Sequence, residues 1–280
     1  MCGFAGIVNT SKLNMSDLVQ SMSEKISHRG PDHNGEYFSC DDDIYLSHRR
    51  LSILDLSSNA NQPFISSDKN SILCFNGEIY NHLELKKKYL HGHDINWITH
   101  SDTETLLYLI KYLGIEKTLK IIDGMFSFLY IDSVGKTISF ARDIFGEKPL
   151  YFYFDQQHLA FSSELKCLEG LQFISYEIDN YSVSMYKNYG YINAPNTIYK
   201  NIKKLEPGQY LSFSFSEQKI KKITDSLFFD KLSESQKNIK QNDDTSIELE
   251  LLISESVKSR MLSDVPVGSC LSGGIDSTLI

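Results

Sequence analysis

The sequence predicts an α+β sandwich built from antiparallel sheets. Short segments rich in β-branched and aromatic residues dominate residues 1–215, and a few helical segments lie between them. Polar turns at Asp132–Gly135 and Asp155–Gln157 are short enough to join neighbouring strands as hairpins. Hairpin strands together with segregated helices are typical of this fold class.

Composition predicts the individual elements of the sandwich. The expected strands are Phe4–Val8, Ile44–Arg49, Ser71–Phe75, Phe126–Ile131, Thr137–Arg142 and Leu150–Phe154. The expected helices are Ser16–Ser27, Ile79–Tyr89 and Thr103–Leu113. Before the last of these, Ser101 precedes Glu104 by three residues, which is the pattern of a capping box.

The composition changes near residue 216 and divides the chain. Residues 216–244 are dense in Lys, Ser, Gln, Asn and Asp, and we expect a linker or exposed extension there. Beyond it, apolar residues at helical spacing predict a helix over Ile247–Met261, and Val265–Leu271 is expected to be a buried strand. One parallel strand cannot complete its hydrogen bonds or bury both faces, so we expect a second domain truncated at Ile280. The predicted domains are therefore 2–215 and 245–280.

Bulk composition excludes several classes of protein. The 280 residues include 41% hydrophobic side chains, which is ample for a packed core. A formal net charge of −8 disfavours binding to nucleic acid, and no apolar run approaches the roughly 20 residues of a membrane helix. The N-terminus lacks the basic residues of a secretory signal. The five cysteines are scattered, which favours reduced thiols in the cytoplasm and neither a disulfide framework nor a metal site.

The cysteine at position 2 is the first candidate for chemistry. If Met1 is removed, Cys2 carries both a free α-amine and a thiol, with pKa values of about 8 and 8.5. The amine can then serve as the base of its own thiol, without a partner from elsewhere in the fold. This economy defines the N-terminal-nucleophile hydrolases. The alternative is a cysteine that occurs at this position without a role.

A second motif lies at the other end of the chain. Ser272-Gly273-Gly274-Ile275-Asp276-Ser277 follows the expected strand. Its glycines let the backbone approach an anion, and its hydroxyls and N–H groups at a helix start supply donors, so it is suited to phosphate. The spacing differs from the common nucleotide-hydrolase loop and is similar to the pyrophosphate loop of ATP-pyrophosphatases. The alternative is an ordinary turn rich in serine and glycine.

Further motifs between these two ends agree with them in order and separation. They are His28–Asp32, Arg50–Ile53, Asn76–His82, Ser101–Glu104, Ala141–Asp143 with Gly146 and Pro149–Tyr151, and Ser163–Lys166. With these motifs, the chain resembles the glutamine-hydrolysing asparagine synthetases. The resemblance implies a class II glutamine amidotransferase domain over 2–215, with the four-layer αββα sandwich of N-terminal-nucleophile hydrolases. It further implies that residues 245–280 are the first helix and strand of an incomplete α/β ATP-pyrophosphatase domain.

The chemistry of glutamine hydrolysis suggests roles that agree with this resemblance. Attack on a carboxamide creates an oxyanion, for which the Asn76 side-chain amide and the Gly77 backbone N–H are suitable donors. Arg50 suits the α-carboxylate of free glutamine as a bidentate fork, and Asp102, helped by Glu78, suits the α-ammonium. The family also places glutamine against Arg50 to Leu54. The implied glutamine-binding residues are Arg50, Leu51, Ser52, Ile53, Leu54, Asn76, Gly77, Glu78 and Asp102, with Cys2, Asn76 and Gly77 catalytic.

Each assignment has a structural alternative. Asn76-Gly77 is a common hairpin turn. Asp102 could cap the helix that follows it, and Arg50 could pair with Asp55 on the surface. Together and in family order, these residues favour the functional interpretation.

The resemblance implies an asparagine synthase that hydrolyses glutamine and uses the ammonia to amidate aspartate, with ATP converted to AMP and pyrophosphate. Glutamine, aspartate and ATP are the implied small-molecule partners; ATP and Mg²⁺ are needed by the full protein and no cofactor by the glutaminase. The implied ATP-binding residues are Leu271, Ser272, Gly273, Gly274, Asp276 and Ser277. Family members are often dimers, so the resemblance is compatible with a homodimer, although the sequence itself does not indicate the oligomeric state. The alternatives are an amidotransferase for another carboxylate, such as a sugar acid, and a non-catalytic fragment.

Overall fold

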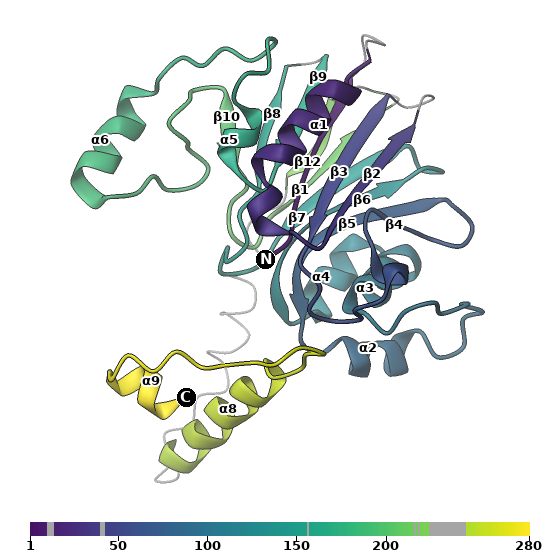
Figure 1. Ribbon diagram of the computed structural model, residues 1–280, viewed down its shortest axis with the longest axis vertical. Helices are drawn as coiled ribbons and strands as arrows, with labels where there is room; N and C mark the ends of the chain where they lie inside the picture. Colours follow the sequence, from purple (N-terminus) through teal and green to yellow (C-terminus); the bar gives the residue numbers. More distant parts are fainter. Residues whose placement is uncertain (10–13, 40–42, 156, 216, 218, 224–244) are drawn as a thin grey trace.

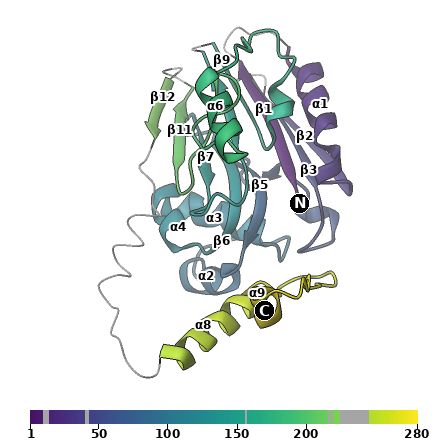
Figure 2. The ribbon, with the colours of Figure 1, turned by 90° about the vertical axis from the view of Figure 1, so that its left-hand side faces the viewer.

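Two antiparallel sheets face each other in the computed structural model, with helices on their outer faces (Figures 1 and 2). The structure describes residues 1–9, 14–39, 43–155, 157–215, 217, 219–223 and 245–280. The sandwich occupies the residues up to 223, and the C-terminal segment lies beneath it in Figure 1. The predicted four-layer αββα arrangement is confirmed.

The first sheet contains the N-terminal strand in an interior position. Its strand order is β10-β8-β9-β1-β3-β2. The bounds are β1 (Gly3–Asn9), β2 (His33–Ser39), β3 (Ile44–Arg50), β8 (Tyr151–Phe154), β9 (His158–Ser162) and β10 (Ile202–Lys204). Because β1 pairs with β3 on one side and β9 on the other, the residue before it is held at a fixed place at the sheet's end.

The second sheet carries the longest strands. Its order is β12-β11-β7-β6-β5-β4. The bounds are β4 (Phe64–Ile65), β5 (Ser71–Ile79), β6 (Gly124–Asp132), β7 (Thr137–Arg142), β11 (Tyr210–Ser214) and β12 (Lys219–Ile223). Both predicted hairpins are confirmed, because β6 pairs with β7 and β8 with β9 in antiparallel register.

The helices cover the two outer faces of the sandwich. One face is packed by α1 (Ser16–Lys25) and the short α5 (Leu165–Leu168), and the other by α2 (His82–Tyr89), α3 (Asp102–Leu113) and α4 (Ile115–Ile121). The other described α-helices are α6 (Asn180–Tyr189), α8 (Thr245–Ser259) and α9 (Ile275–Leu279). None of the helices in the described ranges is long and apolar enough to cross a membrane.

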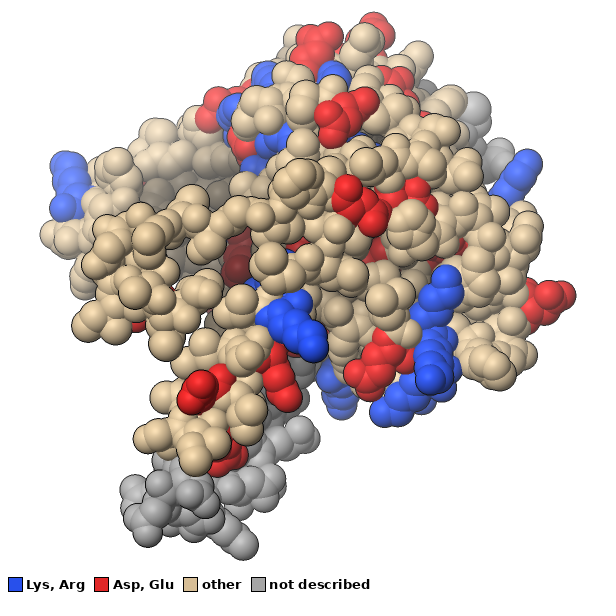
Figure 3. All heavy atoms as spheres, turned by 60° about the horizontal axis from the view of Figure 1, so that its bottom comes forward, with Lys and Arg blue, Asp and Glu red and all other residues tan. Residues whose placement is uncertain are grey.

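Side-chain alternation along β1 shows how the layers are held together. Phe4 and Val8 point into the apolar layer between the sheets, whereas Ala5 and Ile7 pack under α1 and α5. This is the two-residue period of a strand buried on both faces. Figure 3 shows one face of the molecule, on which Lys and Arg side chains lie in groups together with Asp and Glu side chains. Wide areas between these groups carry neither kind of charge.

The predicted capping box at α3 is only half formed. The Ser101 hydroxyl accepts a hydrogen bond from the Glu104 N–H at 3.4 Å, as predicted. The Glu104 carboxylate, however, accepts from the N–H groups of Ile98 and Thr99 instead of the Ser101 N–H. Glu104 therefore fastens the extended segment before the helix.

The C-terminal part of the chain differs from expectation in two places. Val265–Leu271 forms no strand, because none of the described residues lies beside it to complete a ladder. Within the expected linker, residues 219–223 form β12 and pair with β11, while 224–244 fall outside the described residues. The helix predicted over Ile247–Met261 is present as α8.

Candidate active site

Cys2 lies at the mouth of the sandwich, immediately before β1. The pairing of Gly3 with Arg49 places it opposite the residues that follow β3. Its Sγ accepts a hydrogen bond from the Leu51 N–H at 3.3 Å, and its carbonyl accepts one from Arg29 Nε at 2.8 Å. Burial raises the pKa of the Cys2 thiol, while the Leu51 bond and the neighbouring ammonium act to lower it.

Asn76 is a fully buried side chain in β5, and neither its Nδ2 nor its Oδ1 has a hydrogen-bond partner among the described residues. An unpartnered buried amide costs about 1–3 kcal/mol, so such groups often mark a ligand site. The adjacent Gly77 lies against the next strand, where an added Cβ would sit 2.1 Å from the Met125 carbonyl. The hairpin-turn alternative for Asn76-Gly77 is therefore wrong, because both residues lie within a strand.

Arg50, the last residue of β3, is buried and holds a loop with its guanidinium. Nη1 donates to Ser57 O at 2.8 Å and Asn61 Oδ1 at 2.9 Å. Nη2 donates to Leu54 O at 3.3 Å and to Asp55 O. The surface pair with the Asp55 carboxylate is thus wrong, since Arg50 is buried and bonds the Asp55 carbonyl. The bidentate fork expected for a substrate is directed at loop oxygens in this structure.

Asp102 is the first residue of α3 and is buried against the end of β5. Its Oδ2 accepts a hydrogen bond from the Ile79 N–H at 2.9 Å, while the helix cap is provided by Ser101. Burial raises the pKa of Asp102 to about 7, and the nearby Glu78 raises it further against the opposing effect of the Ile79 bond. Burial also raises the pKa of Glu78, which the Lys148 ammonium opposes.

These side chains line one pocket. Of the predicted residues, the pocket wall contains Cys2, Arg50, Leu51, Ile53, Leu54, Asn76, Gly77, Glu78 and Asp102. Ser52 is not part of that wall, and its N–H donates to the Asp32 carboxylate at 2.7 Å. The structure thus brings together residues from positions 2, 50, 51, 53, 54, 76–78 and 102.

Sequence reasoning missed several residues of the wall. They are Met1, Ala60, Gln62, Phe75, Ser101, Thr103, Met125 and Lys148. Lys148 is the most informative of them, because it is a buried cation whose pKa is lowered by burial and raised in part by Glu78. Its position between Gly146 and Pro149, both in a quoted motif, was the available signal.

The predicted ATP residues lie outside this pocket, in the loop before α9 and in the first turn of that helix. Gly273 has φ of 82°, a left-handed conformation that favours glycine. The hydroxyls of Ser272 and Ser277 lie 2.9 Å apart across the loop, and Asp276 is exposed beside them. Hydroxyls, backbone and one carboxylate are thus presented together, a donor set that fits phosphate and a divalent cation.

Comparison with solved structures identifies the fold. A glutamine phosphoribosylpyrophosphate amidotransferase from B. subtilis aligns with a TM-score of 0.56 at 18% identity, covering 80% of this chain and 49% of that one. The sandwich of this chain, with Cys2 just before its first strand, therefore shares the fold of a glutamine amidotransferase.

Family models place the chain more closely. The model described as a glutamine amidotransferase domain matches residues 1–224, and the one described as asparagine synthase matches residues 248–280. Because the first of these models matches well over half of the chain, the chain belongs to the glutamine amidotransferase domain family.

Curated relatives match along the whole chain. Asparagine synthetase [glutamine-hydrolyzing] 1 of Bacillus subtilis is 37% identical over 285 residues, and asparagine synthetase B of Escherichia coli is 32% identical over 283 residues. Both alignments cover 100% of this chain but only 43% and 44% of the relatives. The chain thus spans less than half the length of these proteins.

Proposed function

We propose that this chain hydrolyses free glutamine to glutamate and ammonia at Cys2, and that the ammonia serves the ATP-dependent amidation of aspartate to asparagine. The observation that carries the first half is the buried, unpartnered Asn76 amide in the same pocket as the Cys2 thiol. The second half is supported by the asparagine synthase match over residues 248–280 and by the names of the relatives.

The nucleophile needs a base, and we assign that role to the α-amine of Cys2 after Met1 is removed. With Met1 in place, the Cys2 nitrogen is an amide and cannot accept a proton. Met1 also occupies part of the pocket wall. Burial lowers the pKa of the Met1 ammonium from its ordinary value of 8.0, so an amine in this neighbourhood loses its proton more readily. The same effect would favour the free-base form of the Cys2 amine.

The reaction has two stages, formation of a glutamyl thioester on Cys2 and hydrolysis of that thioester. The amine takes the thiol proton as Sγ bonds to the amide carbon, and the resulting oxyanion is stabilised by the Asn76 amide and the Gly77 N–H. Breakdown releases ammonia, to which the amine returns the proton, and leaves a glutamyl thioester. Water then attacks the thioester, which yields glutamate and restores the thiol.

Recognition of free glutamine follows from the charges of the pocket. Asp102 and Glu78 are suited to the α-ammonium, and the fixed positive charge of Arg50 attracts the α-carboxylate. Because the Arg50 terminal nitrogens already hold the loop, we assign Arg50 an electrostatic role, with backbone groups of residues 51–54 contacting the substrate.

For the synthetase half, we infer that Ser272, Gly273, Gly274 and Ser277 bind the pyrophosphate of ATP. Leu271, just before them, would also contact ATP. Mg²⁺ neutralises phosphate charge when bound, and the exposed Asp276 carboxylate would provide one of its oxygen ligands.

A glutaminase assay on the 280-residue chain and its Cys2→Ala variant tests the first half. We expect glutamate release from the parent, none from Cys2→Ala, and unchanged release from Cys270→Ser, which alters an exposed cysteine far along the chain. Intact mass spectrometry of the active sample should show that Met1 is absent. Release that persists in Cys2→Ala would refute the proposal.

A further inference from the structure

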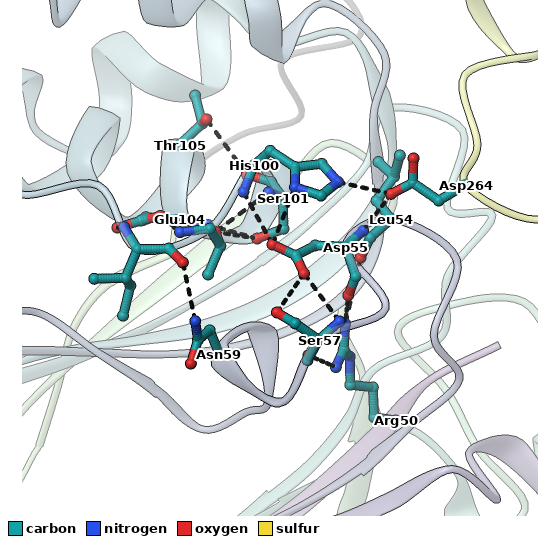
Figure 4. A network of polar contacts seen from close by, with 12 residues as sticks. Arg50, Leu54, Asp55, Ser57, Asn59, His100, Ser101, Glu104, Thr105 and Asp264 are labelled. Carbon is teal, nitrogen blue, oxygen red and sulfur yellow. Dashed lines mark hydrogen bonds and ion pairs between the residues drawn. The ribbon is translucent and has the colours of Figure 1, made fainter.

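Asp264 joins the C-terminal segment to the wall of the glutamine pocket (Figure 4). Its Oδ2 accepts a hydrogen bond from the Asp55 N–H at 2.7 Å and lies 2.8 Å from His100 Nε2. Its own N–H donates to the Ile53 carbonyl at 3.0 Å. Asp264 follows α8 and precedes the Ser272–Ser277 loop. One residue of the C-terminal segment, residues 245–280, thus forms three polar contacts with the amidotransferase domain.

The turn that receives Asp264 is the turn that Arg50 holds. Asp55, at its centre, has φ of 55°, which costs a non-glycine residue about 1–2 kcal/mol. Such a conformation persists when its surroundings fix it. Here the Asp55 carboxylate accepts hydrogen bonds at 3.0 Å from the N–H groups of Ser57 and His100, while its carbonyl accepts one from Arg50.

His100 connects the two aspartates. Its Nε2 faces Asp264, and its Nδ1 lies 3.3 Å from Asp55 Oδ2, so an imidazolium placed here can donate to both carboxylates. The next residues are Ser101 and Asp102, which line the pocket. The His100 side chain therefore holds the 53–57 turn against the segment that carries Asp102.

A second contact of the same segment reaches the residue that follows β5. The Arg260 guanidinium lies 4.4 Å from the ring centroid of Tyr80, directly after β5. Tyr80 is two residues from Glu78, which lines the pocket. The C-terminal segment is thus seated against both the 53–57 turn and the end of the strand that carries Asn76.

We propose that Asp264 is a positioning residue for glutamine binding. It acts through His100 and the 53–57 turn, and these fix the position of the Arg50 guanidinium. With Asp264 seated, the strained turn is fixed and Arg50 is held in the pocket wall. Without it, the Asp55 N–H and His100 Nε2 lose their acceptor and the turn relaxes. The affinity for glutamine then depends on whether the C-terminal segment is bound to the 53–57 turn. This inference rests on the proposed glutaminase function.

The test is a steady-state glutaminase comparison of the 280-residue chain with Asp264→Ala, His100→Ala and the double variant. We expect KM for glutamine to rise at least about fivefold in each single variant, with kcat changed far less. The double variant should add little to either single one, because both act through one network. Glu255→Ala is the matched control, since it removes an exposed carboxylate from α8 in the same segment.

Alkylation of Cys2 distinguishes positioning from general damage. Asp264→Ala should slow modification by a diazoketone analogue of glutamine, which carries the α-carboxylate and α-ammonium, and leave the rate with neutral iodoacetamide unchanged. Asp264→Asn keeps an acceptor for the Asp55 N–H and should show a smaller rise in KM, which provides a second variant if the alanine form does not fold.

An unchanged glutamine KM in both Asp264 variants would overturn the inference while leaving the proposed function intact. Equal slowing of both reagents would also overturn it, because the effect would then be on the thiol itself. Absence of Cys2-dependent glutamate release from the parent chain would contradict the proposed function, and this inference with it.

Discussion

The Asp102 carboxylate accepts a hydrogen bond at 2.9 Å from the backbone N–H of Ile79. Ile79 ends the strand that carries Asn76 and Gly77, and Asp102 begins α3. One buried carboxylate therefore fixes the wall of the pocket, and in the proposed function it would also supply the negative charge for the substrate ammonium. The hydrogen bond to Ile79 stabilises the fold, whereas the buried negative charge destabilises it, because a charge is costly to bury.

Replacing Asp102 with Asn should stabilise the fold at pH 8. The pKa of Asp102 is about 7 in the folded chain against an ordinary value of 3.8, so the folded state favours the protonated form. Its contribution to stability is full below about pH 4 and is lost as the pH rises through 7. We expect Asp102→Asn to raise the free energy of unfolding by a few kcal/mol (roughly 1.4 per pKa unit) at pH 8. Urea unfolding should show that gain disappearing near pH 4.

The same carboxylate should make glutamine binding depend on pH. Below pH 7 Asp102 becomes protonated and loses its attraction for the α-ammonium, so KM for glutamine should rise as the pH falls from 8 to 6. In Asp102→Asn, KM should be high and nearly independent of pH over this range. A parent KM that stays constant between pH 8 and 6 would show that Asp102 does not bind the ammonium.

Asn76→Ala should separate activity from stability. Loss of one oxyanion donor lowers kcat by about 10²–10³-fold. Because neither polar atom of Asn76 has a partner among the described residues, truncation breaks no hydrogen bond there and should leave the urea midpoint nearly unchanged. Ser127→Ala is a matched control, since Ser127 pairs with Asn76 in the sheet and its hydroxyl is likewise unpartnered. A large fall in kcat for Ser127→Ala would argue against a special role for Asn76.

Gly77→Ala should damage the fold as well as the site. The new methyl group would lie 2.1 Å from the Met125 carbonyl, so β5 and β6 must separate. We expect a loss of about 2 kcal/mol or more in the free energy of unfolding, together with loss of glutaminase activity. Gly268→Ala provides the comparison, because nothing lies within 4 Å of the Cβ it adds. Equal stability of the two variants would contradict the close approach of β5 and β6.

The sequence predicted the pocket well because each motif ends or begins an element. Arg50 ends β3, Asn76 and Gly77 lie near the end of β5, and Asp102 begins α3. The positions of these residues along their elements follow from local patterns. Their convergence followed from the family resemblance, because no local pattern relates residues that are tens of positions apart.

Where prediction failed, tertiary contacts decided the outcome. The helix expected from Ile79 begins at His82, because Ile79 pairs with Gly124 as the last residue of β5. The alternative in which Arg50 pairs with the Asp55 carboxylate on the surface is wrong for the same kind of reason. At a positive φ, Asp55 presents its carbonyl to the guanidinium and its carboxylate to His100.

The contact between Asp264 and His100 joins residues 164 positions apart, and no spacing in the sequence indicates it. In the Val265–Leu271 segment, by contrast, the sequence indicates an element that the structure does not form. Its composition favours a strand, but strand formation depends on neighbours that the described residues do not provide.

The interior position of β1 determines when the nucleophile becomes competent. Cys2 is among the first residues to leave the ribosome, yet β1 requires β9 as its second neighbour. Phe4 and Ser163 complete the join, with hydrogen bonds from the Phe4 N–H to the Ser163 hydroxyl and from the Ser163 N–H to the Phe4 carbonyl. Closure over such a separation is slow, so the growing chain carries an unassembled thiol at least until β9 has been made. Under the proposed function, ammonia release would therefore begin only when both sheets have formed, and its onset would report completion of the sandwich.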